Sequence, residues 1–226
     1  MRPVVFADRA AAGEALAAMM QQRKLPPPLL ILGLPRGGVP VAHEIACRLD
    51  APLDVMLVRK IGMPGQPELA MGAVAPGGIV VRDASLERMF PDIGPDFERV
   101  AAQERLELAR REQVYRAGLA PLALQGKTVV LVDDGLATGA TMLAAVRAAR
   151  AGGAARIVVA APVASPQAAR LVGEEADELV ILETPEMLFA IGEWYERFEQ
   201  LDDAEVCELL ARHRDARASH ARGASS

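Results

Sequence analysis

Short runs of apolar residues, each followed by a stretch of helical character, constrain the fold of this chain most strongly. A run of four to six apolar residues is typical of a strand buried on both faces, and its alternation with helices is typical of βα units. We therefore expect an α/β fold, with a mainly parallel sheet and helices on both faces. The five runs are residues 29–34, 55–58, 129–132, 157–161 and 179–182.

Three other segments carry structural signals. Residues 69–81 contain Ala-Pro-Gly-Gly at 75–78, a turn sequence that predicts two antiparallel strands beside the main sheet. Residues 8–22 predict a helix with Asp8 as its N-terminal cap. Residues 96–117 are rich in interspersed acids and bases, which predicts a helix exposed to solvent.

Length and composition limit the classes of function. At 226 residues, of which 51% are hydrophobic, the chain is long enough for one domain with a substantial core. Only 4% of the residues are aromatic and the net charge is -5, so neither base stacking nor a basic groove for nucleic acid is indicated. We expect a small-molecule ligand and no nucleic-acid partner.

The sequence shows no sign of secretion or of a membrane span. Before Asp8 only residues 4–6 are apolar, too few for a signal-peptide core, and no segment approaches the roughly 18 apolar residues that cross a bilayer. Cys47 and Cys207 are far apart and neither lies in a Cys-x-x-Cys pair, so neither a zinc site nor a disulfide framework is indicated. We expect a cytoplasmic protein with reduced thiols and no membrane partner.

The strongest functional signal lies at residues 129–141, which read VVLVDDGLATGAT. Four apolar residues predict a buried strand, and Asp133 and Asp134 follow at its carboxyl end, where parallel sheets bind ligands. The loop that leads from these acids to a helix N-terminus contains Gly139 and Thr141, and its amides and hydroxyls suit a phosphate group. Because two carboxylates would repel a bare polyphosphate, the ligand should also present hydroxyls or a divalent metal ion.

This run closely resembles the motif by which type I phosphoribosyltransferases bind 5-phosphoribosyl-1-pyrophosphate (PRPP). The resemblance implies that Asp133 and Asp134 hold the ribose hydroxyls during catalysis and contact Mg²⁺ indirectly, through those hydroxyls or water. It also implies the type I phosphoribosyltransferase fold, with a core of about residues 29–182. The residues that it assigns to the 5-phosphate are Gly135, Ala137, Thr138, Gly139, Ala140 and Thr141.

Other phosphate motifs do not fit this sequence. A P-loop would need Gly-Lys-Ser/Thr, but Gly139 is followed by alanine and threonine. A haloacid dehalogenase phosphatase would need two aspartates two positions apart, whereas Asp133 and Asp134 are neighbours. Residues 33–38 lack the spacing of a dinucleotide-binding turn.

Two further segments predict a pyrophosphate site. Residues 32–39 read as a strand entering a glycine-rich turn, in which Arg36 offers a fork for phosphate oxygens and Gly37 and Gly38 allow close backbone approach. By the resemblance, this turn holds pyrophosphate and contains a cis peptide between Pro35 and Arg36. A second segment supplies an anion clamp at the end of a strand, Arg59 and Lys60.

The acceptor of the phosphoribosyl group is less clearly marked. Residues 61–68, with two glycines and two prolines, predict a mobile loop over the ligand. Ala137 stands where 6-oxopurine enzymes carry an aspartate, whereas adenine-type enzymes have alanine there and take an acid from the mobile loop. By that resemblance Glu68 is a candidate general acid–base group, and purine salvage is the implied pathway. Residues 84–124 are an insertion and residues 189–195 carry no base-binding signature that we can assign, so the base stays open.

The two ends of the chain flank the sheet in sequence. Residues 1–25 and 183–211 together would cover its carboxyl edge as a small layer, which in the family is called the hood and recognises the base. We expect one phosphoribosyltransferase domain over residues 1–211. Residues 212–226 have no apolar period and predict a disordered tail.

The sequence thus predicts a Mg²⁺-dependent glycosyltransferase of the pentosyl class. It would move 5-phosphoribosyl from PRPP to a nitrogen nucleophile, such as a nucleobase, and release pyrophosphate; a homodimer is expected. Two alternatives stay open: a PRPP- or nucleotide-binding regulator with the same fold and no turnover, and phosphorolysis or hydrolysis at the anomeric carbon.

Overall fold

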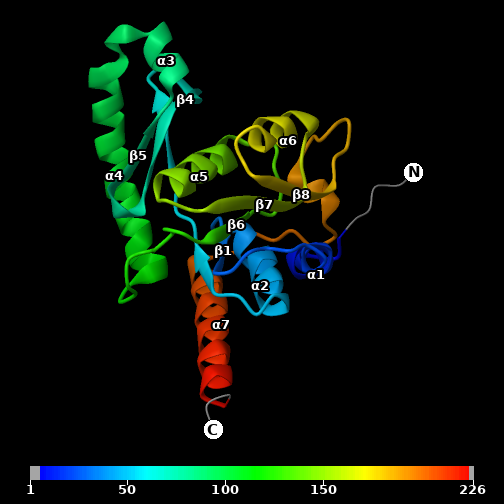
Figure 1. The fold of residues 1–226 in the computed structure, drawn as a ribbon. Helices are drawn as coiled ribbons and strands as arrows, with labels where there is room; N and C mark the ends of the chain where they lie inside the picture. Colours follow the sequence, from blue (N-terminus) through cyan, green and yellow to red (C-terminus); the bar gives the residue numbers. More distant parts are fainter. Residues whose placement is uncertain (1–5, 224–226) are drawn as a thin grey trace.

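A five-stranded sheet forms the centre of the molecule (Figure 1). In the computed structural model, which describes residues 6–223, its strand order is β2-β1-β6-β7-β8 and all neighbouring strands are parallel. The expected α/β fold is therefore confirmed, although the run 55–58 overlaps its strand only at Val55. The strands are β1 (Leu29–Gly33), β2 (Leu53–Val55), β6 (Thr128–Val132), β7 (Arg156–Val163) and β8 (Glu178–Glu183).

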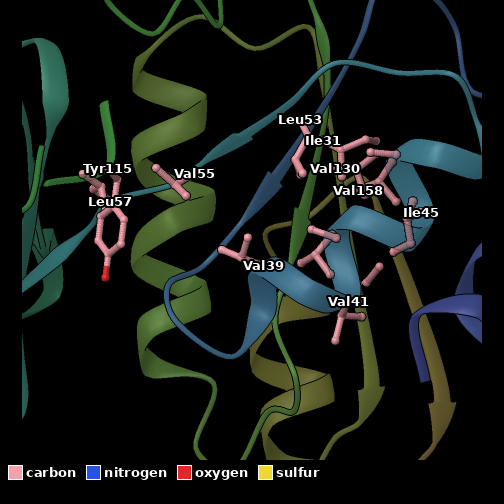
Figure 2. Close-up of a cluster of buried hydrophobic side chains, with 14 of the residues drawn as sticks. Ile31, Val39, Val41, Ile45, Leu53, Val55, Leu57, Tyr115, Val130 and Val158 are labelled. Atoms are coloured by element: carbon pink, nitrogen blue, oxygen red, sulfur yellow. The ribbon is translucent and has the colours of Figure 1, made fainter. Parts of the chain in front are cut away.

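Helices cover both faces of this sheet, as predicted. Alternate strand residues point to opposite faces, so Val130 joins one half of the core and Leu131 the other. Figure 2 shows the first half, where Ile31 and Val130 pack with Ile45. The helices on this side are α1 (Arg9–Gln21) and α2 (Gly38–Arg48), and those on the other are α5 (Ala140–Ala151) and α6 (Pro166–Gly173). Asp8 caps α1 by accepting a hydrogen bond from the amide of Ala11.

A second sheet of three antiparallel strands projects to one side of the main sheet (Figure 1). Its last two strands are joined by a 3-10 turn over Pro76–Gly78, which confirms the antiparallel pair expected within residues 69–81. The long helix α4 packs against the first two strands. The elements are β3 (Arg59–Met63), β4 (Gln66–Ala75), β5 (Ile79–Arg82), α3 (Ala84–Met89), the 3-10 segment Pro91–Ile93 and α4 (Gly94–Arg116).

Helix α4 is less exposed than its charge predicts. The Glu107–Arg111 pair lies on its surface as expected, but Phe97 is buried against the small sheet. Arg116 is also buried, and its guanidinium donates two hydrogen bonds of 3.0 Å to the carboxylate of Asp54 in β2. The expectation of a solvent-exposed helix is therefore wrong for one face of α4, because sequence did not reveal the partners of that face.

The C-terminal segment is a helix in the described residues. Helix α7 (Asp203–Gly223) packs against α2 and β2, and His213 within it is only 5% exposed. The expectation of a disordered tail is therefore wrong for residues 212–223, while 224–226 lie outside the described residues. Tertiary contacts with α2 and β2 stabilise this stretch although its own sequence lacks an apolar period.

Residues from both ends of the chain meet at the carboxyl end of β7. The amide of Phe6 donates to the carbonyl of Trp194 at 2.8 Å, and Phe6 forms a β-bridge with Tyr195. Both pack with Val163, the last residue of β7, while residues 1–5 lie outside the described part. Within residues 6–223, no helix combines the length and the apolar character that crossing a membrane would require.

Candidate functional site

Asp133 and Asp134 follow β6 directly, at the carboxyl edge of the main sheet. The parallel register pairs Gly33 with Val132, and the amide of Leu34 donates to the carbonyl of Val132 at 2.8 Å. The loops after β1 and β6 therefore begin side by side. This register brings the glycine-rich turn and the acid pair, which are about a hundred residues apart in sequence, to one place.

The two carboxyl groups lie in a poorly solvated position. Burial, and then the adjacent charge of Asp134, raise the pKa of Asp133 well above its usual range, and burial also raises the pKa of Asp134. Two groups from the hood residues hold Asp134 in place. Arg9 donates from Nε to Asp134 Oδ2 at 2.7 Å, and the Tyr195 hydroxyl donates to the Asp134 carbonyl at 2.6 Å.

The loop between β6 and α5 presents a helix N-terminus. Gly139 has a φ of 75° in the left-handed region and immediately precedes the first residue of α5. The first amides of a helix have no partner within it, so they are available to an anion. Ser165 holds the loop from the other side, donating from Oγ to the Ala137 carbonyl at 2.7 Å. The six residues predicted to bind the 5-phosphate all lie in this loop or in the first turn of α5.

The turn after β1 packs directly against the acid pair. A Cβ atom on Gly37 would lie 1.9 Å from Asp134 Oδ2, and one on Gly38 would lie 2.4 Å from the Val132 carbonyl oxygen. These two glycines are therefore needed for contact with the end of β6, in addition to the close approach to an anion for which sequence suggested them. The Pro35–Arg36 peptide is cis, as the resemblance implies.

Cationic side chains from three elements line two cavities beside this turn. One cavity of about 510 Å³ contains Arg59, Lys60 and Arg111, together with Thr141 at the start of α5. The second, of about 340 Å³, contains Arg111 again together with Arg36. Pro35 lies on both, so the cis peptide stands between two positively charged hollows.

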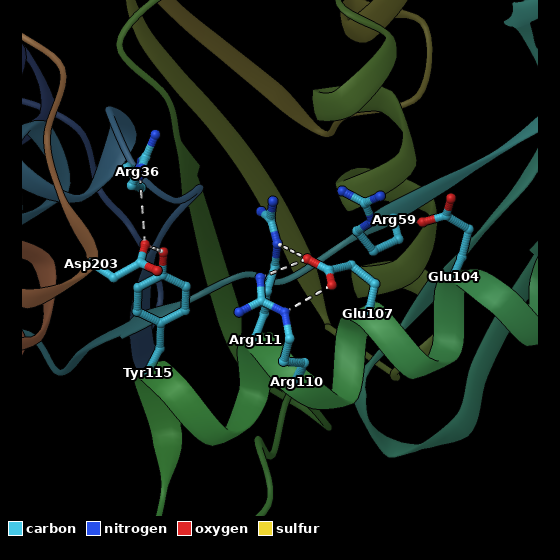
Figure 3. Close-up of polar contacts among 8 residues, drawn as sticks. All are labelled: Arg36, Arg59, Glu104, Glu107, Arg110, Arg111, Tyr115 and Asp203. Atoms are coloured by element: carbon cyan, nitrogen blue, oxygen red, sulfur yellow. Dashed lines mark hydrogen bonds and ion pairs between the residues drawn. The ribbon is translucent and has the colours of Figure 1, made fainter.

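Carboxylates on α4 and α7 contact the arginines of these cavities in the free protein (Figure 3). Glu104 accepts a hydrogen bond of 2.6 Å from Arg59. Glu107 accepts from Arg110 and Arg111, and these bonds lower the pKa of Glu107 to about 2. Each arginine is therefore positioned before a ligand arrives.

Asp203, at the start of α7, is a third carboxylate that contacts an arginine of the site. It accepts a hydrogen bond of 2.5 Å from the Tyr115 hydroxyl and lies 3.9 Å from the Arg36 guanidinium (Figure 3). The turn after β1, α4 and α7 thus meet at one point on the rim of the site.

Comparison with known proteins identifies this arrangement. The family model named Phosphoribosyl transferase domain matches residues 8–196. The chain belongs to this family. The resemblance seen in residues 129–141 is thereby confirmed, together with the phosphoribosyltransferase fold that it implies.

Relatives of this phosphoribosyltransferase-family chain include two Mycobacterium tuberculosis proteins, from strains CDC 1551 / Oshkosh and H37Rv. Each is named "Putative phosphoribosyl transferase" and is 43% identical over 212 residues, covering 93% of this chain and 48% of the relative. This chain thus spans about half the length of those relatives. Among solved structures, the crystal structure of TT1426 from Thermus thermophilus has 44% identity and a TM-score of 0.82, covering 91% of this chain and 97% of that one.

The segment predicted as a mobile loop is a β-hairpin. Residues 61–68 contain the end of β3, a turn with Gly65 at a φ of 79°, and the start of β4. The segment is therefore more regular than the predicted loop, because pairing between β3 and β4 satisfies its backbone groups. Its mobility over the ligand stays a prediction. Glu68 belongs to β4 by its backbone, and its side chain lies outside the described residues.

Sequence reasoning missed the site residues that come from the hood and from the insertion. Arg9 and Tyr195 contact Asp134, and Arg110 and Arg111 line the second cavity. Most of the chain's aromatic residues lie at Phe6 or within 189–198, and this concentration in an aromatic-poor chain could have marked the hood. The arginines of α4 had no such signal, because their neighbours are charged as well.

Proposed function

We propose that this protein transfers the 5-phosphoribosyl group of PRPP to a nitrogen nucleophile of a nucleobase and releases pyrophosphate. The observation that carries the proposal is the meeting of a carboxylate pair, a helix N-terminus and an arginine-rich rim at one sheet edge. PRPP carries one matching group for each feature: ribose hydroxyls for the carboxylate pair, a 5-phosphate for the helix N-terminus and a pyrophosphate for the arginine-rich rim. Membership of the phosphoribosyltransferase family supports the same assignment.

Each part of PRPP has a proposed partner. Residues 135–141 bind the 5-phosphate through backbone amides and hydroxyls. Asp133 and Asp134 accept hydrogen bonds from the ribose hydroxyls. The pyrophosphate lies on the turn after β1 and on the cations around it, which are Arg36, Gly37, Gly38, Arg59 and Lys60, with Arg111 as an addition from α4.

The proposed catalysis is mainly electrostatic. The bond between C1 of the ribose and the pyrophosphate oxygen breaks, the positive charge that develops at C1 is stabilised by the nearby carboxylates, and the base nitrogen forms the new bond. The cations stabilise the negative charge that the leaving pyrophosphate gains. Because Arg9 and Tyr195 already fix Asp134, and the Asp134 amide donates to Asp133 Oδ1, little reorganisation is needed as the charge develops.

The chain's donor set fits Mg²⁺ in an indirect role. Among the described residues the site offers paired carboxylate oxygens, which suit a hard cation that keeps part of its water shell. Asp133 and Asp134 would hold the ion through ribose hydroxyls or water. When bound with PRPP, Mg²⁺ neutralises charge on the pyrophosphate.

The proposed acceptor of the phosphoribosyl group is a purine of the adenine type, and the proposed pathway is purine salvage. Its support is Ala137, which stands where 6-oxopurine enzymes carry an acid, and Glu68, which β4 carries toward the tip of the hairpin. Glu68 would exchange a proton with the base. Substitution of Glu68 by glutamine should lower turnover while PRPP affinity changes little.

We also propose that the protein acts as a homodimer in the cytoplasm. Met187 is 72% exposed and Phe189 is 79% exposed, and two large apolar side chains so close together on the surface favour a protein contact. Sedimentation of the wild type beside a Phe189→Ser variant tests the dimer, and cell fractionation tests the location.

The decisive experiment is a screen of nucleobases with PRPP and Mg²⁺, read as pyrophosphate release. Release that depends on one base supports transfer, binding of PRPP without release would indicate a regulator, and release without a base would indicate hydrolysis. The Asp133→Asn/Asp134→Asn double variant is the control. Each charge-assisted hydrogen bond contributes roughly 1.5–3 kcal/mol, so the double variant should lose at least about a hundredfold in PRPP affinity.

A further inference from the structure

Three potential metal ligands meet between α2 and α7, along the stretch of α2 from its middle toward its C-terminal end. His43 and Cys47 lie one helical turn apart on α2, and His213 comes from the neighbouring α7 (Figure 1). One ligand atom from each of the three lies within 4.8 Å of the other two. The two helices thus bring together residues that are 166 positions apart in sequence.

The distances match those of a tetrahedral metal site. Cys47 Sγ lies 3.6 Å from His43 Nε2 and 3.7 Å from His213 Nδ1. Zinc–nitrogen bonds of about 2.05 Å and zinc–sulfur bonds of about 2.3 Å, at a tetrahedral angle, place nitrogen and sulfur about 3.6 Å apart. Cys47 Sγ also lies 4.0 Å from His43 Nδ1, so the His43 ring must turn for its Nε2 lone pair to point at a shared ion.

Both imidazoles are oriented by a partner on their outer nitrogen. His213 Nε2 lies 3.0 Å from the carbonyl oxygen of Ala51, and His43 Nδ1 lies 3.1 Å from Glu44 Oε1. A carbonyl or carboxylate oxygen only accepts, so each of these nitrogens carries the proton. The other nitrogen of each ring, the one nearer to Cys47 Sγ, then carries a lone pair, as in metal-ligating histidines.

The number of protons also favours an ion. Two imidazole nitrogens lie within 3.7 Å of the Cys47 sulfur, but a thiol has only one proton to donate, so Cys47 can donate to only one of them. A cation bound to the thiolate and to both nitrogens satisfies all three. Binding would release the thiol proton to solvent.

A metal ion can reach Cys47 from solvent, and the types of ligand atom favour a transition metal. Cys47 is exposed and borders a surface hollow of about 410 Å³ that Glu14, Glu44 and Arg48 also line, so the charged side chains around it carry a net negative charge. Water in this hollow can complete the coordination. Two nitrogens and one sulfur suit Zn²⁺ and related transition metals, whereas Mg²⁺ prefers oxygen.

We propose that His43, Cys47 and His213 form a binding site for Zn²⁺ or a similar divalent transition metal. The site is separate from the proposed PRPP site and from its Mg²⁺, so the inference goes beyond the proposed function. The ion would join α7 to α2. Since α2 begins at Gly38 and α7 begins at Asp203 near Arg36, it would fix two elements that reach the rim of the phosphoribosyltransferase site.

The test uses Co²⁺ as a probe, added to the reduced, chelator-treated 226-residue chain. We expect one equivalent to give thiolate-to-cobalt charge-transfer absorption and the visible bands of tetrahedral Co²⁺, and Zn²⁺ to displace it. Cys47→Ser should abolish the charge-transfer band, and His43→Gln should weaken binding at least about tenfold. Cys207→Ser and His220→Gln, which change the same residue types elsewhere, should leave the spectrum unchanged.

Two results would overturn the proposal: no stoichiometric Co²⁺ binding by the wild type, or an unaltered spectrum in Cys47→Ser. Because His213 is buried and its replacement could disturb folding, the more exposed His43 and Cys47 carry the test. Zn²⁺ should also raise the melting temperature of the wild type and of Cys207→Ser but not that of Cys47→Ser. Neither measurement depends on PRPP, so its outcome is independent of the proposed transfer reaction.

Discussion

Arg9 and Asp134, which are 125 positions apart in sequence, form a nearly buried ion pair with a distance of 2.7 Å between Nε and Oδ2. The arginine side chain is 12% exposed and the aspartate 16%. The guanidinium also lies 3.9 Å from the centroid of the Phe198 ring, a cation–π contact that fixes it from the hood side. The hood is therefore joined to the acid motif by charge as well as by packing.

Substitution of Arg9 by glutamine should destabilise the free protein. Removing one partner of a buried ion pair leaves an uncompensated charge and costs about 3 kcal/mol in free energy of unfolding. Urea denaturation measures the loss. Arg197→Gln is the matched control, because Arg197 is 61% exposed in its pair with Asp8 and should change stability by less than about 1 kcal/mol.

A double-mutant cycle tests whether the Arg9 effect acts through Asp134. When Asp134→Asn already removes the charge, Arg9→Gln should cost much less than it does in the wild type. Equal losses in both backgrounds would mean that Arg9 stabilises the hood only through Phe198 and the Glu199 carbonyl.

Asp133→Asn should stabilise the free protein at neutral pH. The pKa of Asp133 is raised by burial and by the charge of Asp134, so above its folded-state pKa the carboxylate lowers the stability of the fold. That cost disappears as the pH falls through the raised pKa toward the unfolded value of 3.8. Melting temperatures measured from pH 7 to pH 4 should therefore show a gain in the variant that shrinks with acidity.

The control for this experiment is an aspartate whose side chain is exposed to solvent. Asp96→Asn, on the exposed surface of α4, should show no comparable gain. A gain for Asp133→Asn that stays constant down to pH 4 would assign the effect to packing. A fall in PRPP affinity of the Asp133→Asn variant would show separately that the carboxylate is needed for ligand binding.

The parts of the site that follow a buried strand could be predicted, and the parts that depend on distant contacts could not. Asp133 is recognisable because the apolar strand before it fixes where the sheet ends, and the cis turn at Arg36 followed from the family resemblance. Arg9 and Arg111 reach the site through the packing of α1 and α4, which no local pattern encodes. Residues 212–223 were misjudged for the same reason, since the contacts of His213 decide their structure.

Arg36→Gln and Lys60→Gln should each weaken pyrophosphate binding about tenfold or more and leave ribose 5-phosphate binding nearly unchanged. A hydrogen bond to a charged group contributes roughly 1.5–3 kcal/mol, and only the pyrophosphate is proposed to contact these cations. Calorimetry with the two ligands measures the contrast. Arg99→Gln, an exposed arginine on α4, controls for the change in net charge.

Equal losses for both ligands would mean that the rim does not form a separate pyrophosphate site. Arg111→Gln extends the test to the insertion, because Arg111 lines both cavities. If the proposal holds, this variant should resemble Arg36→Gln.

Arg116→Met should lower the free energy of unfolding by about 3 kcal/mol, since it leaves the Asp54 carboxylate without its bidentate partner. Chemical denaturation measures the change. Arg212→Gln is the control, because Arg212 and Glu208 are both exposed on α7 and their pair should contribute less than about 1 kcal/mol. A similar loss in both variants would show that Arg116 does not hold α4 through Asp54.

The β3–β4 hairpin should respond to PRPP and Mg²⁺ at its tip and not at its base. Arg59–Ile61 pair in regular register with β4, but the register shifts on both sides of Gly62, so the ladder weakens toward the turn. In the free protein, amides of residues 59–61 should exchange hydrogen slowly and those of Met63, Gly65, Gln66 and Glu68 quickly. Ligand should slow exchange at the tip by about tenfold or more.

The Gly77–Gly78 turn, at the other end of β4, is the internal control and should not change. Equal exchange at the tip with and without ligand would make the hairpin a fixed wall of the site rather than its lid.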